Sequence, residues 1–264
     1  MKTKLVLALA IFLLLLGGCQ LLAPPSSPHL LLGNPSNAGN APNNYLMKKP
    51  QYALSYNRDK GTPNWVSWQL NSKWMGDVKR QNNFTPDDSL PSGWYRVKSE
   101  DYTRSGYDRG HMTPSADRTA TIEDNQATFL MTNIVPQTPN NNRGAWKNLE
   151  DYCRDLVKEG KELYIVAGVY GRREEIGKQE YVTAPSHTWK IIVVFDRPRM
   201  GLKNLSQNTR VIAVDVPNRK NTSSDWERYI VSVDEIEDLT GYNFLSEVSP
   251  SLQKAIESKI DKGE

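Results

Sequence analysis

One short stretch of the chain concentrates side chains that can do acid–base chemistry. The sequence GYDRGHMTPSADRT, residues 106–119, holds two aspartates, two arginines and one of only three histidines in the chain. It has few apolar side chains, which predicts a loop that is exposed or lines a cleft. A lone histidine is more often structural than catalytic. The charged neighbours of His111, and glycines that permit close approach of a ligand to the backbone, favour a catalytic role.

A second polar cluster begins a predicted helix. The segment TPNNNRGAWKNLEDYCR, residues 138–154, overlaps apolar spacing that predicts an amphipathic helix over 143–160, with a glycine as its stop. Asn141 or Asn142 can cap this helix, and either can present an amide oxygen to a cation.

Two charged residues of this helix share a broad face with Asn142. At 100° per residue, Glu150 and Arg154 lie about 80° and about 120° around the helix from Asn142. The simpler interpretation is a capping asparagine and an exposed Glu150–Arg154 pair one turn apart. The alternative is a cation ligand, an acceptor for the cation's water and a phosphate clamp. The helix by itself favours the simpler interpretation.

Together the two clusters hold what phosphodiester cleavage requires. A histidine can activate water, an oxygen ligand suits Mg²⁺, and arginines offset charge on the transition state. A zinc hydrolase would need more His, Cys or acidic ligands than these clusters offer. The two clusters therefore favour a metal-dependent phosphodiester hydrolase.

The first residues are typical of an export signal. Lys2 and Lys4 precede an apolar run over 5–16, which is too short for a comfortable membrane span. We expect a signal peptide over 1–18. The sequence LGGC that closes it resembles a bacterial lipobox, in which Cys19 becomes lipidated, and ordinary secretion is the alternative. In both cases the protein is expected to be exported, either secreted or lipid-anchored at the cell envelope.

Cysteine usage and charge narrow the chemistry further. Without Cys19 only Cys153 remains, which excludes an intrachain disulfide and a thiolate metal cluster. Cys153 lies in the helical pattern, where a small buried hydrophobe is expected, with a nucleophile as the alternative. The net charge of +3 falls to +1 when Lys2 and Lys4 leave with the signal. That balance does not indicate a polyanionic partner by itself.

The rest of the chain predicts one domain behind a linker. Residues 19–49, rich in Pro, Ser, Asn and Gly, predict a flexible tether, and the domain is expected over 50–264. Strands are predicted over 52–56, 64–70, 128–133, 162–171, 188–196 and 209–217. Further helices are expected over 233–239 and from about 250. This order predicts an α+β fold around a mostly antiparallel sheet.

The two motifs, in this order, resemble a known family. DRGH at 108–111 followed by NNNRGAWKNLE at 140–150 is similar to the DNA/RNA non-specific endonucleases, which include mitochondrial endonuclease G. The similarity is greatest to NucA-type sugar-non-specific nucleases and covers roughly 52–260. It implies a ββα-metal active site, in which a strand and loop carry His111 and a helix carries the metal ligand.

The resemblance also implies a role for each candidate residue. His111 would be the general base, Asn142 the only direct protein ligand of Mg²⁺ or Mn²⁺, and Glu150 the holder of metal-bound water. Asp108 would position water or the loop. Phosphate contacts would come from the three arginines Arg80, Arg109 and Arg154.

The resemblance implies hydrolysis of DNA and RNA, single- or double-stranded, by a one-metal, histidine-base mechanism. A protein inhibitor is a further candidate partner. The lipobox cysteine is not part of the family pattern, so release and anchoring both stay open. A surface lipoprotein that binds nucleic acid or cell-wall polymer without turnover is the non-enzymatic alternative. It is disfavoured because no residue of the implied site is missing.

Overall fold

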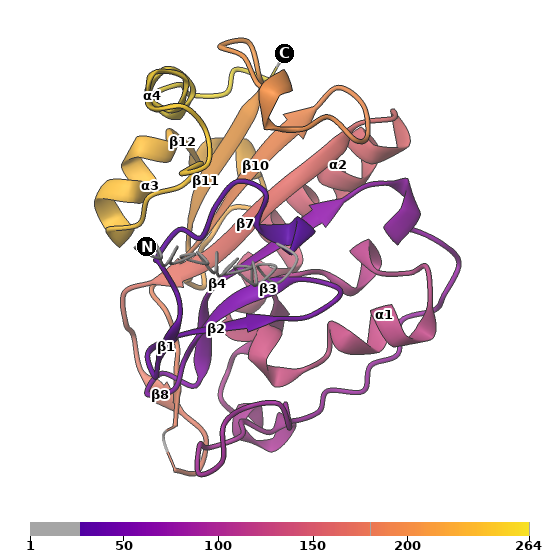
Figure 1. Cartoon of the computed structure of the whole chain (residues 1–264). Coiled ribbons are helices and arrows are strands. Elements are labelled where there is room, and N and C mark those ends of the chain that lie inside the picture. Colours follow the sequence, from indigo (N-terminus) through magenta and orange to yellow (C-terminus); the bar gives the residue numbers. More distant parts are fainter. Residues whose placement is uncertain (1–26, 180, 264) are drawn as a thin grey trace, which may run out of the picture.

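An eight-stranded sheet runs through the protein, and every strand pair in it is antiparallel (Figure 1). The structure is a computed structural model that describes residues 27–179 and 181–263. In order across the sheet, the strands are β1 (Asn40–Ala41), β2 (Asn44–Lys48), β3 (Ala53–Asn57), β4 (Thr62–Leu70), β7 (Glu162–Tyr170), β10 (His187–Phe195), β11 (Val211–Pro217) and β12 (Ile230–Val231). The expected α+β fold with a mostly antiparallel sheet is confirmed.

Helices cover both faces of this sheet. Alternate residues of a strand point to opposite faces, and here both sets of side chains are apolar and need to be covered. On β4, Val66 and Trp68 join the core cluster that contains α2 (Lys147–Lys158), whereas Trp65 joins the other cluster. That other cluster contains α3 (Val233–Thr240) and α4 (Pro250–Glu257), which lie together in Figure 1. The central strands are therefore buried along nearly their whole length.

A small two-stranded ribbon lies outside the main sheet and leads into α2. Its strands are β5 (Asp108–His111) and β6 (Ile134–Gln137), paired so that His111 faces Ile134. After β6 the chain forms a π-helical turn, Asn141–Trp146, and continues as α2. Two strands followed by a helix make the expected ββα arrangement.

Shorter elements complete the fold. The helix α1 (Ile122–Ala127) lies between β5 and β6, and β8 (Glu175–Ile176) pairs with β9 (Val182–Thr183). Short 3₁₀ helices are Pro28–Leu30, Ser72–Trp74, Ser99–Tyr102, Ser115–Asp117, Met131–Asn133, Leu202–Asn204 and Trp226–Tyr229. None of the helices in the described part of the chain is both long enough and apolar enough to cross a membrane.

The tether expected over 19–49 is wrong for residues 27–49, which fold onto the domain. β2 pairs with β3, and Leu32 and Ala38 are buried in the core. His29 is 1% exposed: its Nε2 lies 2.8 Å from the carbonyl oxygen of Pro50, and its Nδ1 accepts the amide of Gln69 at 3.2 Å. The expected signal peptide over 1–18 and Cys19 lie outside the described residues.

Two other local predictions are also wrong. The apolar run over 128–133 is a turn followed by the 3₁₀ helix Met131–Asn133, and the strand begins only at Ile134. The predicted helix over 143–160 is not regular at its start, because Gly144 has the non-helical angles φ −104° and ψ −110°. Asn142 therefore precedes α2 instead of lying on its face, and the angular argument from ideal helix geometry does not hold for it.

Candidate active site

His111 is the last residue of β5, and its side chain is held in an aromatic wall. The residue is 7% exposed, and the centroid of its ring lies 4.9 Å from that of Phe129 and 5.4 Å from that of Phe84. Its carbonyl oxygen accepts a hydrogen bond of 3.1 Å from Nε1 of Trp146. The segment around His111, which was expected to be a loop, is thus the buried end of a strand. A hydrogen bond from Trp146, in the π-helical turn, holds it in place.

The surroundings of His111 keep its imidazole neutral. Burial, together with the positive charges of Arg80 and Arg109, lowers its pKa to about 3. Nε2 is buried and has no hydrogen-bond partner, and it is the only nitrogen of this ring in that condition. Nδ1 is therefore the nitrogen with access to water. A neutral imidazole nitrogen that faces water can accept a proton.

Asn142 is oriented by Asp108, the first residue of the same strand. Its Nδ2 donates to Asp108 Oδ2 at 2.9 Å, and Asp108 also accepts two hydrogen bonds from the Arg143 guanidinium, at 2.8 and 2.6 Å. Burial alone would raise the pKa of Asp108, but the hydrogen bonds from Arg143 and Asn142 hold it below its usual value. With its NH₂ group so fixed, the amide Oδ1 accepts no hydrogen bond from any described residue.

The capping role considered for Asn141 or Asn142 is wrong. Asn141 donates from Nδ2 to Thr188 Oγ1 at 2.9 Å, and Asn142 binds Asp108. Neither side chain accepts a backbone amide, and neither residue is the N-cap of α2. The free amide oxygen of Asn142 is instead the kind of neutral ligand that Mg²⁺ and Mn²⁺ accept, so the residues present fit a hard cation.

Glu150, on the first turn of α2, lies close to a buried lysine. Its Oε1 is 3.9 Å from Nζ of Lys190, and its side chain is 14% exposed. Burial raises the pKa of Glu150 to about 7; the charges of Lys190 and Arg154 oppose this, and those of Asp117 and Asp151 add to it. The carboxyl is therefore poised between its neutral and charged forms near neutral pH.

Arg154 has acidic partners other than Glu150. Its Nη1 donates to the buried Asp117 at 2.9 Å, its Nη2 contacts Asp151, and its side chain is 12% exposed. The exposed Glu150–Arg154 pair of the simpler interpretation is absent from the ion pairs of the described residues. The arginine expected to contact phosphate is thus already engaged in a buried ion pair.

The other two arginines lie beside the aromatic wall and His111. Arg80 stacks 4.9 Å from the Phe129 ring centroid, and Arg109 lies 4.4 Å from that of Phe84. Arg80 also donates to Ser115 at 3.2 Å, and Arg109 to Ser99. Both charges act on the pKa of His111, so the fold gathers them at the histidine as expected.

The structure therefore brings the predicted residues into one region, linked by β5, the π-helical turn and α2. Four further residues contribute to the site and were not predicted from the sequence. Arg143 and Trp146 lie inside the motif over 140–150, and Asp117 lies in the segment 106–119. Lys190 could have been found as the one charged residue inside the apolar run TWKIIVVF.

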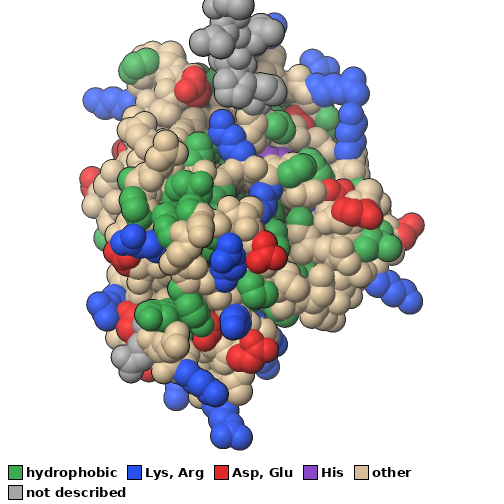
Figure 2. Space-filling model, turned by 60° about the horizontal axis from the view of Figure 1, so that its bottom comes forward, with side chains coloured by type: hydrophobic (Ala, Val, Ile, Leu, Met, Phe, Trp, Pro, Cys, Tyr) green, Lys and Arg blue, Asp and Glu red, His purple; other side chains and the backbone are tan. Residues whose placement is uncertain are grey.

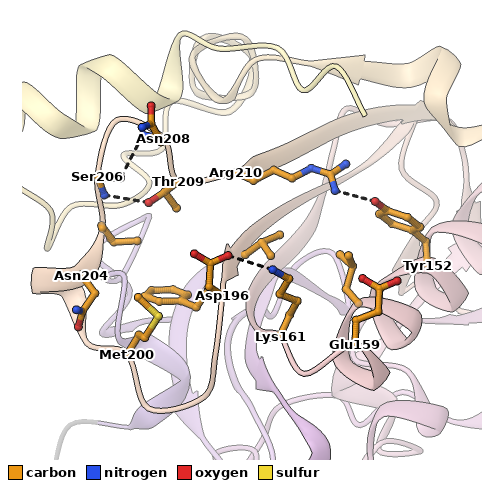
Figure 3. A pocket seen from close by; sticks show the side chains of 14 residues that line it. Tyr152, Glu159, Lys161, Asp196, Met200, Asn204, Ser206, Asn208, Thr209 and Arg210 are labelled. Carbon is orange, nitrogen blue, oxygen red and sulfur yellow. Dashed lines mark hydrogen bonds and ion pairs between the residues drawn. The ribbon is translucent and has the colours of Figure 1, made fainter. Parts of the chain in front are cut away.

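Other hollows and acidic groups lie elsewhere. A cavity of about 510 Å³ at the far end of α2 is lined by Tyr152, Lys161, Asp196 and Arg210 among others, and contains no predicted site residue (Figure 3). Asp234, Glu237 and Glu257 form the only cluster of three acidic or histidine ligands among the described residues, on α3 and α4, across the sheet from α2. On the face drawn in Figure 2, basic side chains are mixed with acidic and apolar ones and form no single patch.

The chain is similar to known proteins over most of its length. A sequence model of the DNA/RNA non-specific endonucleases matches residues 32–251. The chain belongs to this family. It is 62% identical to a nuclease of Nostoc sp. strain PCC 7120 over 91% of the chain and 88% of that protein. It is 31% identical to the human mitochondrial nuclease EXOG, over 73% of the chain and 55% of EXOG.

The chain thus spans most of the Nostoc nuclease but little more than half of EXOG. A solved structure, a crystal structure of the EndoG/EndoGI complex described as showing the mechanism of EndoG inhibition, matches with a TM-score of 0.72 and 26% identity. The match covers 86% of this chain and 94% of that one. Family membership identifies the protein as a metal-dependent endonuclease of the hydrolase class, with DNA and RNA as its class of substrate, on a ββα site.

Proposed function

We propose that this endonuclease hydrolyses phosphodiester bonds of DNA and RNA, single- or double-stranded, with one divalent cation and His111 as general base. The observation that carries the proposal is the hydrogen bond between Asn142 and Asp108. It ties the side-chain amide of Asn142 to the strand that ends at His111 and leaves the amide oxygen free. The cation ligand on the π-helical turn and the neutral base at the end of β5 are thereby linked.

Asn142 would hold Mg²⁺ or Mn²⁺ through Oδ1, and Glu150 would accept hydrogen bonds from the water bound to the ion. When bound, such an ion supplies a Lewis acid for the phosphate and leaving-group oxygens. Asp108 and Arg143 keep the Asn142 amide from turning. The NH₂ group of Asn142 donates to the Asp108 carboxylate, and Arg143 holds that carboxylate in place. Carboxylate and amide oxygens suit a hard cation and offer no thiolate or imidazole set for zinc.

His111 would take the proton of the water that attacks phosphorus, while the bond to the leaving sugar oxygen breaks. A pKa of about 3 makes it a weak base in the free protein, because two guanidiniums lie near it. A phosphate bound to Arg80 and Arg109 brings negative charge to the same place. It offsets those guanidiniums and raises the pKa of the base toward the working range.

Contacts made to phosphate carry no information about the base or the sugar. Arg80 and Arg109 provide such contacts, and this supports cleavage of both nucleic acids with little sequence preference. The test is digestion of plasmid DNA, single-stranded DNA and RNA by the 27–264 chain with Mg²⁺ and with EDTA. His111→Ala is the inactive variant, and His187→Ala, on β10, is the matched control. Activity in EDTA, or cutting only at one sequence, would reject the proposal.

We propose further that the protein is exported, with Cys19 as a lipid-anchor site. The support is the basic start, the apolar run and the LGGC ending of residues 1–19. In a native bacterial host, a fatty-acid analogue should label the wild type, and Cys19→Ser should move the protein to a soluble pool. An unlabelled wild type would mean ordinary secretion.

A protein inhibitor is a further proposed partner. The similarly folded EndoG has been crystallised with EndoGI, and this supports looking for one here. A heat-labile, protease-sensitive component of a host extract should then suppress the purified nuclease. Suppression that survives heating and protease would show competing nucleic acid instead.

A further inference from the structure

Lys190 is a fully buried lysine in the middle of an apolar strand. It is 1% exposed, and the rest of β10 is hydrophobic apart from His187 and Thr188 at its start. Alternation along the strand places it on the same face as Ile192 and Val194, which pack in the α2 core cluster. The ammonium therefore points toward the helix that carries Glu150.

Three groups surround the Lys190 ammonium. Nζ lies 4.1 Å from the ring centroid of Trp146, 5.8 Å from that of Trp68, and 3.9 Å from Oε1 of Glu150. Both aromatic faces attract a cation. Trp146 is also the residue whose indole N–H holds the carbonyl of His111 at 3.1 Å. The lysine thus contacts two separate supports of the site.

Stability gives little reason for a lysine at this position. Removing an ammonium from water is unfavourable, and apolar residues of similar volume replace buried ion pairs with little loss or with a gain in stability. A hydrophobic residue would continue the pattern of the strand. Among the described residues, Glu150 is the carboxylate that pairs with this charge.

We propose that Lys190 is a positioning residue of the active site, which acts through Glu150 by holding its carboxylate toward the cation site. The inference rests on the proposed function, in which Glu150 binds the water of the metal ion. Lys190 is also the first of the groups that oppose the effect of burial on the pKa of Glu150, ahead of Arg154. Asp117 and Asp151 act in the opposite direction.

A double-mutant cycle on Mn²⁺ binding tests this, with the 27–264 chain and isothermal titration calorimetry. Lys190→Met and Glu150→Gln should each raise the Kd for Mn²⁺ by roughly 10- to 100-fold, as loss of outer-shell partners does. The double variant should bind no more than about twofold more weakly than Glu150→Gln alone, because the two residues act as a unit. Lys161→Met, which removes a surface lysine paired with Asp196, is the charge-matched control and should bind as the wild type does.

Circular dichroism on the same variants separates folding from positioning. Lys190→Met leaves the buried Glu150 without its partner and should melt below the wild type, whereas the double variant removes both charges and should recover much of that loss. The comparison of Mn²⁺ binding by the double variant with that by Glu150→Gln then decides, because both lack the carboxylate charge. Equal Kd values for Lys190→Met and the wild type would overturn the inference, and so would losses that multiply in the double variant. A wild type that binds no Mn²⁺, or an unchanged Glu150→Gln, would instead reject the proposed metal site and the inference with it.

Discussion

The side-chain amide of Asn142 donates to Oδ2 of Asp108 at 2.9 Å, and this contact joins the π-helical turn to the strand that carries His111. Asp108 in turn accepts hydrogen bonds from Nε and Nη2 of the exposed Arg143 guanidinium. The aspartate of the DRGH motif therefore does more than complete a loop. It fixes which atom of Asn142 is left free.

Asp108→Asn should weaken the site by loosening that orientation. The variant keeps an acceptor oxygen but loses the charge that holds Arg143, so we expect about a 10- to 100-fold loss of activity at low Mg²⁺. Excess metal should restore part of it. Asp155→Asn, which removes the partner of Lys158 on the exposed face of α2, is the matched control. A Mg²⁺ titration of plasmid cleavage measures both variants. Equal half-saturation concentrations of Mg²⁺ for Asp108→Asn and the wild type would contradict the role of Asp108.

The pH dependence of metal binding should follow Glu150 and not His111. Burial raises the pKa of Glu150 to about 7, so its carboxyl is protonated below that pH and charged above it. His111, with a pKa of about 3, stays neutral throughout this range. The affinity for Mn²⁺ should therefore fall as the pH is lowered from 8 to 6, and Glu150→Gln should flatten the profile. Calorimetric titrations at several pH values check this, and a profile unchanged by Glu150→Gln would count against it.

Salt dependence should identify the arginines that contact phosphate. Arg80 and Arg109 lie beside His111, so replacing either with alanine should reduce the slope of log affinity against log salt by about 0.7–0.9. Binding of an oligonucleotide to an inactive His111→Ala background, at several salt concentrations, measures the slope. An unchanged slope in both variants would show that other groups hold the phosphate.

Arg154→Ala should act mainly on stability. It leaves the buried carboxylate of Asp117, only 2% exposed, with the Trp68 indole as its remaining partner. Loss of one member of a buried pair costs about 3–5 kcal/mol in free energy of unfolding. Arg228→Ala, at a 70% exposed side chain, should cost less than about 0.5 kcal/mol. Urea unfolding monitored by tryptophan fluorescence compares the two variants. Equal unfolding midpoints for Arg154→Ala and Arg228→Ala would contradict a structural role of Arg154.

Truncation should show that residues 27–49 belong to the fold. A 50–264 chain lacks β1 and β2 and the buried side chains of Leu32 and Met47, each worth about 1.5–3 kcal/mol on burial. Together with the lost strand pairing, this approaches the whole stability of an ordinary domain. Circular dichroism should show a cooperative melt for 27–264 and none for 50–264. Equal melting temperatures would restore the tether interpretation.

The main sheet was predictable from the sequence because its strands carry their own pattern. β7 and β10 are buried on both faces and read as continuous apolar runs, and β3 and β4 are rich in aromatic and apolar residues. The residue pattern alone did not predict β5, because DRGH has no such pattern, although the resemblance implied a strand and loop at His111; β6 begins just after the strand predicted over 128–133. They are strands only because they pair with each other across a long connection.

The contacts within the site were less predictable from the sequence than the two motifs that contain its residues. The resemblance supplied roles for Asn142 and His111, but nothing local shows that Gly144 interrupts the helix after Asn142. The partners of Arg154 and Glu150 come from segments far along the chain, Asp117 and Lys190, and only the folded sheet brings them together. The tether was misjudged because composition alone cannot show that Leu32 and His29 find a buried place.

The assignment of base and metal ligand is tested most directly by titrating Mg²⁺ and Mn²⁺ against His111→Ala and Asn142→Ala. Loss of a general base costs about 10²- to 10⁴-fold and cannot be repaired by metal, so His111→Ala should stay slow at saturating ion. Asn142→Ala should show a raised metal requirement that millimolar Mn²⁺ partly relieves, because Glu150 still holds the hydrated ion. Rescue of His111→Ala by excess metal, with no rescue of Asn142→Ala, would contradict the assignment of both residues.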